Sequence, residues 1–204
     1  MENIPKEITD AFETGDLILF HTNHDGSLFG RLIQFFTGSN YSHVGMILRD
    51  PTFIDKKLVG LLFLESAWEN FPDCENNVKK LGAEIVDLER MIQGTGSMNL
   101  YYRKLTLKNG KKIDENKMKE IHKVIHNKPY DTVPNDWLQA FLKIDTKPQK
   151  EDRFWCSALV GYVYTKLGLL PKDTDWSILR PDFFSDSNKC DLIDAELGPE
   201  IQLK

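Results

Sequence analysis

The sequence is poor in cysteine and lacks linkers rich in glycine, serine or proline. Its 204 residues include three cysteines, an odd number at widely separated positions. This pattern indicates neither a disulfide framework nor a zinc-binding cysteine motif, and it is typical of a reducing compartment. Because no linker or internal repeat interrupts the chain, we expect a single domain over residues 1–204.

Long apolar runs and concentrated positive charge are also missing. No window approaches the roughly 20 apolar residues that span a bilayer, and the acidic amino terminus lacks the apolar segment of a secretory signal. A net charge of -5 without a basic stripe argues against nucleic acid as a partner. We therefore expect an intracellular protein without a transmembrane segment, for which peripheral membrane contact and the oligomeric state stay open.

Apolar and β-branched runs predict strands over residues 17–20, 41–48 and 58–67, followed by shorter strands over 84–88 and 99–107 separated by a loop at 93–97. The two-residue period places His43 on one strand face with Gly45, and Glu65 on one face with Phe63. If these two strands pair antiparallel, His43 and Glu65 can lie on the same side of the sheet. A glutamate in so apolar a strand needs a partner, since a buried unpaired carboxylate is costly.

Helical periodicity indicates two longer helices and several shorter segments. Asp114 is the expected N-cap of a helix to about residue 127, with Met118, Ile121, Val124 and Ile125 as its buried stripe. Its His122 and His126 are interpreted as surface cations, because the helix lacks the adjacent glutamate of the zinc-protease pattern. Residues 8–12 and 137–142 predict short helices, residues 28–36 a core helix or an apolar groove, and the tail after Pro171 irregular packing.

The stretch 153–170 holds the candidate nucleophile. Apolar residues recur at helical spacing and Gly168 with Pro171 supplies a stop, which predicts a core-facing helix. Cys156 lies in its first turn, where unpaired N–H groups and the helix dipole favour a thiolate. The alternative is that Cys156 is a small buried apolar side chain.

A cysteine nucleophile needs a base, and the base needs a group that orients it. Of the five histidines, His43 lies inside a strand beside a second strand that offers Glu65. This placement favours His43 as base and Glu65 as orienting residue, with a structural histidine–glutamate pair as the alternative. His21 and His24 complete no metal-ligand spacing, so neither a metal nor a cofactor is expected.

The ordered segments GDLILF, YSHVGMIL, FLESAW, KPYD and FWCSALVGYVY resemble the permuted papain-like cysteine hydrolases. The resemblance is to the YiiX-like branch of bacteria and poxviruses, related to NlpC-type amidases, and it covers residues 15–170. It implies a circularly permuted papain-like α+β fold, with an antiparallel sheet packed against helices. It also implies Cys156 as nucleophile, His43 as base and Glu65 as orienting residue. The bacterial relatives often carry an acidic residue two places after the cysteine, where this chain has Ala158.

The implied activity is that of a cysteine amidase or peptidase working through a thioester acyl-enzyme. The N–H of Cys156 is the expected oxyanion donor, with the Tyr41 hydroxyl or a loop amide as the second, and Tyr130 is expected to line the cleft. Because the chain shows no export signal, a cytoplasmic or virus-packaged enzyme fits better than one acting on peptidoglycan. Lipid acyl hydrolysis or transfer by the same triad, and a non-catalytic module that binds acyl groups or peptides, stay open as alternatives.

Overall fold

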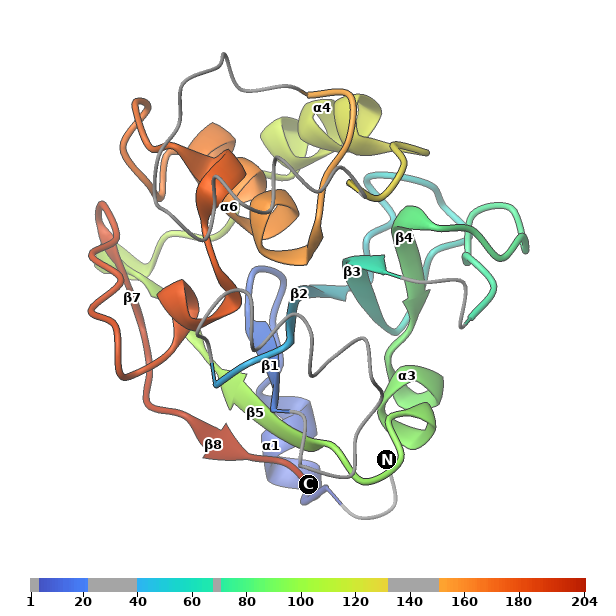
Figure 1. Ribbon diagram of the computed structural model, residues 1–204, viewed down its shortest axis with the longest axis horizontal. Coiled ribbons are helices and arrows are strands. Elements are labelled where there is room, and N and C mark those ends of the chain that lie inside the picture. Colours follow the sequence, from blue (N-terminus) through green and yellow to red (C-terminus); the bar gives the residue numbers. More distant parts are fainter. Residues whose placement is uncertain (1–3, 22–39, 68–70, 132–150) are drawn as a thin grey trace.

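The main architectural feature is a six-stranded antiparallel sheet in the order β4-β3-β2-β1-β5-β8 (Figure 1). The computed structural model describes residues 4–21, 40–67, 71–131 and 151–204. The six strands are β1 (Leu17–His21), β2 (His43–Arg49), β3 (Leu61–Ala67), β4 (Gly82–Asp87), β5 (Asn99–Arg103) and β8 (Ile201–Gln202). A separate pair joins β6 (Leu105–Leu107) to β7 (Ala195–Leu197).

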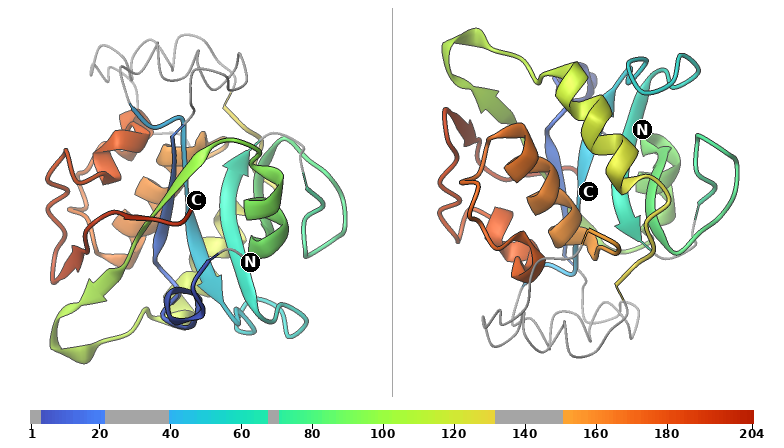
Figure 2. Two further views of the ribbon diagram at one scale, coloured as in Figure 1. Left: turned by 90° about the horizontal axis from the view of Figure 1, so that it is seen from below. Right: turned by 90° about the horizontal axis from the view of Figure 1, so that it is seen from above.

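Helices cover both faces of this sheet (Figure 2). One face packs against α4 (Glu115–Ile125) and α6 (Cys156–Leu167), whereas α1 (Lys6–Asp10) and α3 (Leu88–Gly94) lie on the other. Three short 3-10 helices complete the described chain: η1 (Lys108–Gly110), η2 (Trp176–Ile178) and η3 (Pro181–Phe184). The prediction of an α+β fold with an antiparallel sheet packed against helices is confirmed.

Burial on both faces explains why the central strands read as continuous apolar runs. In β1, Leu17 and Leu19 belong to the core under α4 and α6, while Ile18 and Phe20 belong to the core on the opposite face. All four side chains are buried, as expected for a strand between two layers. None of the helices in the described ranges is both long enough and apolar enough to cross a membrane.

The predicted ends of the two long helices are confirmed. Asp114 caps α4, because its Oδ1 accepts the N–H of Lys117 at 3.0 Å. Helix α6 ends at Gly168, whose φ of 85° lies in the left-handed region that favours glycine. The N-cap of α6 is Trp155, which makes no side-chain capping bond, so the first N–H groups of this helix can serve other acceptors.

Three sequence-based expectations need correction. Helix α3 follows β4 directly, where only a loop at 93–97 was expected; Asp87 starts it by accepting the N–H of Arg90 at 2.9 Å. The strand expected over 99–107 is divided into β5 and β6. The tail is less irregular than expected, since β7 and β8 each pair with an earlier strand. Residues 28–36 and 137–142, and with them His24, lie outside the described residues.

Asp16, just before β1, is hydrogen-bonded to three different parts of the chain, and its replacement should destabilise the fold. Its buried carboxylate accepts hydrogen bonds from the Tyr102 hydroxyl at 2.7 Å, from the Leu105 N–H at 2.8 Å and from the Glu13 N–H at 2.8 Å. An Asp16→Ala change is expected to lower the free energy of unfolding by about 3 kcal/mol, because buried donors lose a charged acceptor. Urea unfolding measures this, with the exposed Asp10→Ala as matched control; equal midpoints for both variants would contradict the prediction.

Candidate active site

The candidate site begins with a short contact between two neighbouring strands. His43 is the first residue of β2, and its Nε2 lies 2.6 Å from Oε2 of Glu65 in β3. The antiparallel register, in which Ile47 faces Phe63, brings the two residues to the same side of the sheet. Glu65 is 4% exposed, so the histidine supplies the partner that this buried carboxylate needs.

Cys156 reaches the same point from the first turn of α6. Burial by itself raises the pKa of the Cys156 thiol, but the charge of His43 and a hydrogen bond to it lower that pKa below its ordinary value. The backbone N–H groups of Val44 and Ser157 lower it further by donating to the sulfur. The two backbone donors had no sequence signal, because they follow from the meeting of a strand end with a helix start.

His43 shows the complementary effect. Burial by itself lowers the pKa of His43, but the Cys156 sulfur and the Glu65 carboxylate outweigh this and raise it to about 10. Since Nε2 is held by Glu65, we assign the bond to Cys156 to Nδ1. At neutral pH the arrangement therefore favours an imidazolium between a thiolate and a carboxylate.

Hydrogen bonds to the backbone fix how α6 approaches the sheet. Ser66, next to Glu65, donates from its buried hydroxyl to the carbonyl of Phe154 at 2.7 Å. The hydroxyl of Ser157, next to Cys156, donates to the carbonyl of Leu179 at 2.7 Å. The residues beside Cys156 and beside Glu65 are thus both anchored by hydrogen bonds to backbone carbonyls.

Gly45 leaves room for the ring of Phe63 on the neighbouring strand β3. A Cβ at this position would overlap the ring of Phe63 and approach the Leu64 carbonyl oxygen at 2.9 Å. The space beside this glycine is therefore taken by an aromatic ring on the neighbouring strand.

The two tyrosines predicted near the site have different surroundings. Tyr130 is buried, its pKa is raised well above the ordinary value by burial and by the nearby Cys156, and its backbone bridges to Phe154. The Tyr41 hydroxyl donates to Oε2 of Glu200 at 2.7 Å, so in this arrangement its hydrogen is directed to the carboxyl-terminal tail. Their roles toward a substrate stay predictions.

A second buried carboxyl group, missed by the sequence interpretation, lies beside Glu65. Glu84 on β4 is directly opposite Glu65 in the strand register and is 2% exposed. Neither of its side-chain oxygens has a hydrogen-bond partner within the described ranges. Burial, and then the negative charge of Glu65, raise the pKa of Glu84 to about 8.

The interpretation of His122 and His126 as surface cations was wrong for His122. This residue is buried with 8% exposure, and its Nε2 lies 3.0 Å from Oε2 of Glu75. Nδ1 of His126 lies 3.1 Å from the same oxygen. Together these three side chains form a group that could hold a metal ion. Glu75 precedes α4 by many residues, so helical spacing could not reveal it.

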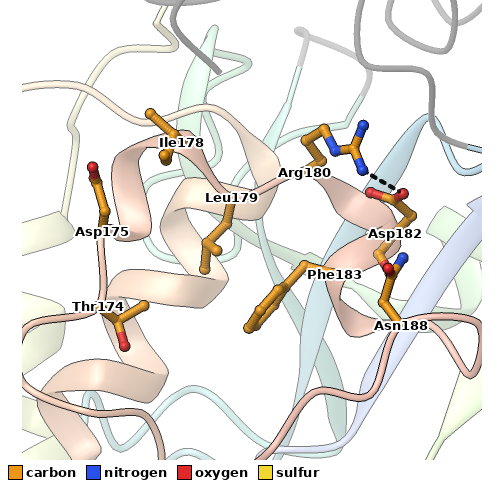
Figure 3. A pocket seen from close by; sticks show the side chains of 8 residues that line it. All are labelled: Thr174, Asp175, Ile178, Leu179, Arg180, Asp182, Phe183 and Asn188. Atoms are coloured by element: carbon orange, nitrogen blue, oxygen red, sulfur yellow. Dashed lines mark hydrogen bonds and ion pairs between the residues drawn. The ribbon is translucent and has the colours of Figure 1, made fainter. Parts of the chain in front are cut away.

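A pocket of about 310 Å³ is lined by residues of η2, η3 and the segments next to them (Figure 3). Its wall includes Leu179, whose carbonyl accepts the Ser157 hydroxyl and the Trp155 indole N–H. Ile178 and Phe183 supply further apolar surface, while Arg180 pairs with Asp182 at 3.1 Å. The lining thus combines three apolar side chains with five polar or charged ones, and the backbone carbonyl of Leu179 bonds to Trp155 and Ser157 on either side of Cys156.

Comparison with known proteins gives a distant structural similarity. No family model matches the chain, and no curated protein matches it. Among solved structures, the chain is similar to the metalloprotein YiiX from Escherichia coli O157:H7 at 23% sequence identity. The match covers 77% of this chain and 67% of that chain, with a TM-score of 0.48. The YiiX-like relationship, the permuted papain-like arrangement and the catalytic roles stay predictions.

Proposed function

We propose that this protein is a cysteine hydrolase of the permuted papain-like type that cleaves an amide or peptide bond. The observation that carries the proposal is the meeting of three side chains: Cys156 at the start of α6 is hydrogen-bonded to His43, whose Nε2 lies 2.6 Å from Oε2 of Glu65. Structural cysteines are usually inert thiols with raised pKa values, and partial burial raises the pKa of Cys74 and of Cys190 in this chain. Cys156 differs from them through its histidine, which is itself held by a carboxylate.

The proposed reaction uses these groups in sequence. The Cys156 thiolate attacks the carbonyl carbon of the substrate, and the carbonyl oxygen takes up the negative charge. The imidazolium of His43 then gives its proton to the leaving nitrogen as the carbon–nitrogen bond breaks, which leaves a thioester on Cys156. His43, now neutral, takes a proton from water, and the resulting hydroxide equivalent hydrolyses the thioester to regenerate the thiolate.

Backbone donors at the start of α6 suit the charged intermediate. The N–H of Cys156 lies at the positive end of a twelve-residue helix that has no side-chain cap. Glu65 keeps the ring of His43 in place and stabilises its protonated form.

The test is to trap the acyl-enzyme from a panel of peptide amides, isopeptides and acyl-lipid esters. After acid quench, intact-mass and peptide mass spectrometry should locate the acyl group on Cys156, and turnover of an amide should fall at least ~10³-fold in Cys156→Ala. Cys190→Ala is the matched control and should retain full turnover. Hydrolysis of lipid esters alone would contradict the amidase proposal. Ligand binding without any turnover would indicate a binding module.

A further inference from the structure

Glu75, His122 and His126 form a side-chain cluster that the proposed hydrolase does not use. Glu75 lies in the turn between β3 and β4, while the two histidines come from the end of α4. Both imidazoles approach the same carboxylate oxygen, at 3.0 and 3.1 Å, and all three ligand atoms lie within 4.8 Å of one another. Cys156 and His43, in contrast, belong to α6 and β2.

Helix geometry accounts for the histidine pair. Residues four apart lie on the same helix face, and the two ring centroids are 5.2 Å apart. His122 is almost fully buried, whereas the side chain of His126 is 34% exposed. The cluster is therefore enclosed by protein around His122 and exposed to solvent at His126, so an ion can reach it.

The turn that carries Glu75 is held in place before any ligand binds. Asp73 Oδ1 accepts the N–H of Glu75 at 2.6 Å, and Lys57 Nζ donates to the Glu75 carbonyl at 2.5 Å. Lys80, further along this segment, donates to Oδ1 of Asn127 just beyond α4 at 2.7 Å. Since these bonds fix the carboxylate relative to the helix end, ligand binding need not order the chain first.

We propose that Glu75, His122 and His126 bind a divalent cation of the zinc type, which links α4 to the turn between β3 and β4. Two imidazole nitrogens and one carboxylate oxygen are a ligand set that suits Zn²⁺, whereas Ca²⁺ and Mg²⁺ prefer oxygen alone. With bond lengths of 2.0–2.2 Å, tetrahedral zinc ligands lie about 3.3 Å apart, close to the two nitrogen–oxygen distances here. Water completes the coordination on the exposed side of His126.

The experiment is calorimetric titration of the chelator-treated full chain with Zn²⁺, repeated on single variants. Wild type should bind one equivalent with a Kd below 10⁻⁵ M, and Glu75→Gln and His126→Asn should each weaken binding at least 10-fold. His126→Asn is the sharper variant, because its partly exposed side chain can change without loss of the fold. The thermal midpoint of wild type should rise with Zn²⁺ and return to its starting value on addition of EDTA.

Variants of the cysteines separate this site from the proposed hydrolase. Cys156→Ser and Cys74→Ser should bind Zn²⁺ like wild type, and the Co²⁺ form should show four-coordinate visible bands without a thiolate charge-transfer band. The proposal is overturned if wild type binds no Zn²⁺ at 100-micromolar concentrations, or if folded His126→Asn binds as tightly as wild type. It is equally overturned if Cys156→Ser abolishes binding. The inference does not depend on the hydrolase, so loss of Zn²⁺ binding and loss of amidase activity are distinguishable results.

Discussion

Replacing His43 by glutamine is expected to slow the alkylation of Cys156 by iodoacetamide about 10²-fold at pH 6. In wild type the charge of His43 lowers the pKa of the thiol, so a larger fraction is thiolate at this pH than in the variant. Without that charge, burial raises the thiol pKa, and the thiolate fraction at pH 6 falls to well below 1%. Lower intrinsic nucleophilicity of a low-pKa thiolate offsets part of this factor.

The pH dependence of Cys156 labelling should also differ between wild type and His43→Gln. Below the pKa of His43, about 10, wild-type labelling at Cys156 should depend less on pH than labelling of the variant, because the charge that lowers the thiol pKa persists there. Labelling of the variant should instead rise with pH until the unpaired thiol ionises. Mass spectrometry of each cysteine measures both profiles.

The other two cysteines and a variant of a distant histidine serve as controls for this result. Burial raises the pKa of Cys74 to about 11 and that of Cys190 to about 12, so both should label slowly in every variant. His126→Asn changes a histidine of the other cluster and should leave Cys156 unaffected. A His43→Gln protein that melts normally but labels Cys156 at the wild-type rate would contradict the thiolate–imidazolium pair, and with it the proposed hydrolase.

A Glu84→Gln change is expected to stabilise the protein at pH 9 by as much as about 4 kcal/mol relative to wild type. The folded-state pKa of Glu84 is about 8, well above the ordinary 4.5 of an unfolded glutamate. Below pH 4.5 both states hold the proton and no stability is lost. Between pH 4.5 and 8 the unfolded chain releases a proton that the folded chain keeps, so wild-type stability falls as pH rises.

Urea unfolding at pH 5, 7 and 9 measures this effect. The wild-type and Glu84→Gln curves should nearly coincide at pH 5 and separate progressively toward pH 9. Glu120→Gln is a suitable control, since that side chain is 68% exposed in a surface ion pair and should change stability little at any pH. The same pH dependence for wild type and Glu84→Gln would refute the prediction that Glu84 is protonated in the folded protein at neutral pH.

The location of Glu84 also illustrates the limits of sequence interpretation. The strand over 84–88 was predicted, but nothing in its pattern indicates that Glu84 faces Glu65, because register between strands is a long-range property. The helix α3 was missed for a related reason. Its seven residues follow a strand without any break, and short helices depend on tertiary packing more than on propensity.

The histidines of α4 show how a correct helix can still yield a wrong interpretation. The N-cap at Asp114 and a buried stripe were predicted from local pattern; the structure confirms the cap and the burial of Met118, Ile121 and Ile125, while Val124 is only partly buried. The same helical spacing put His122 on the polar face, yet it is buried because the turn around Glu75 packs over that face. A helix pattern describes one element and carries no information about what covers it.

Local pattern by itself determined the elements whose ends are chemically marked. Periodicity and backbone preference act over a few residues, and they suffice to predict β1, the N-cap at Asp114 and the helix α6 that ends before Gly168. Tertiary structure alone decided that the Cys156 thiol meets His43, that Glu84 faces Glu65, and that Glu75 joins two histidines. These contacts change pKa values and create sites because burial brings charges together in a medium that screens them poorly, and sequence spacing does not encode that proximity.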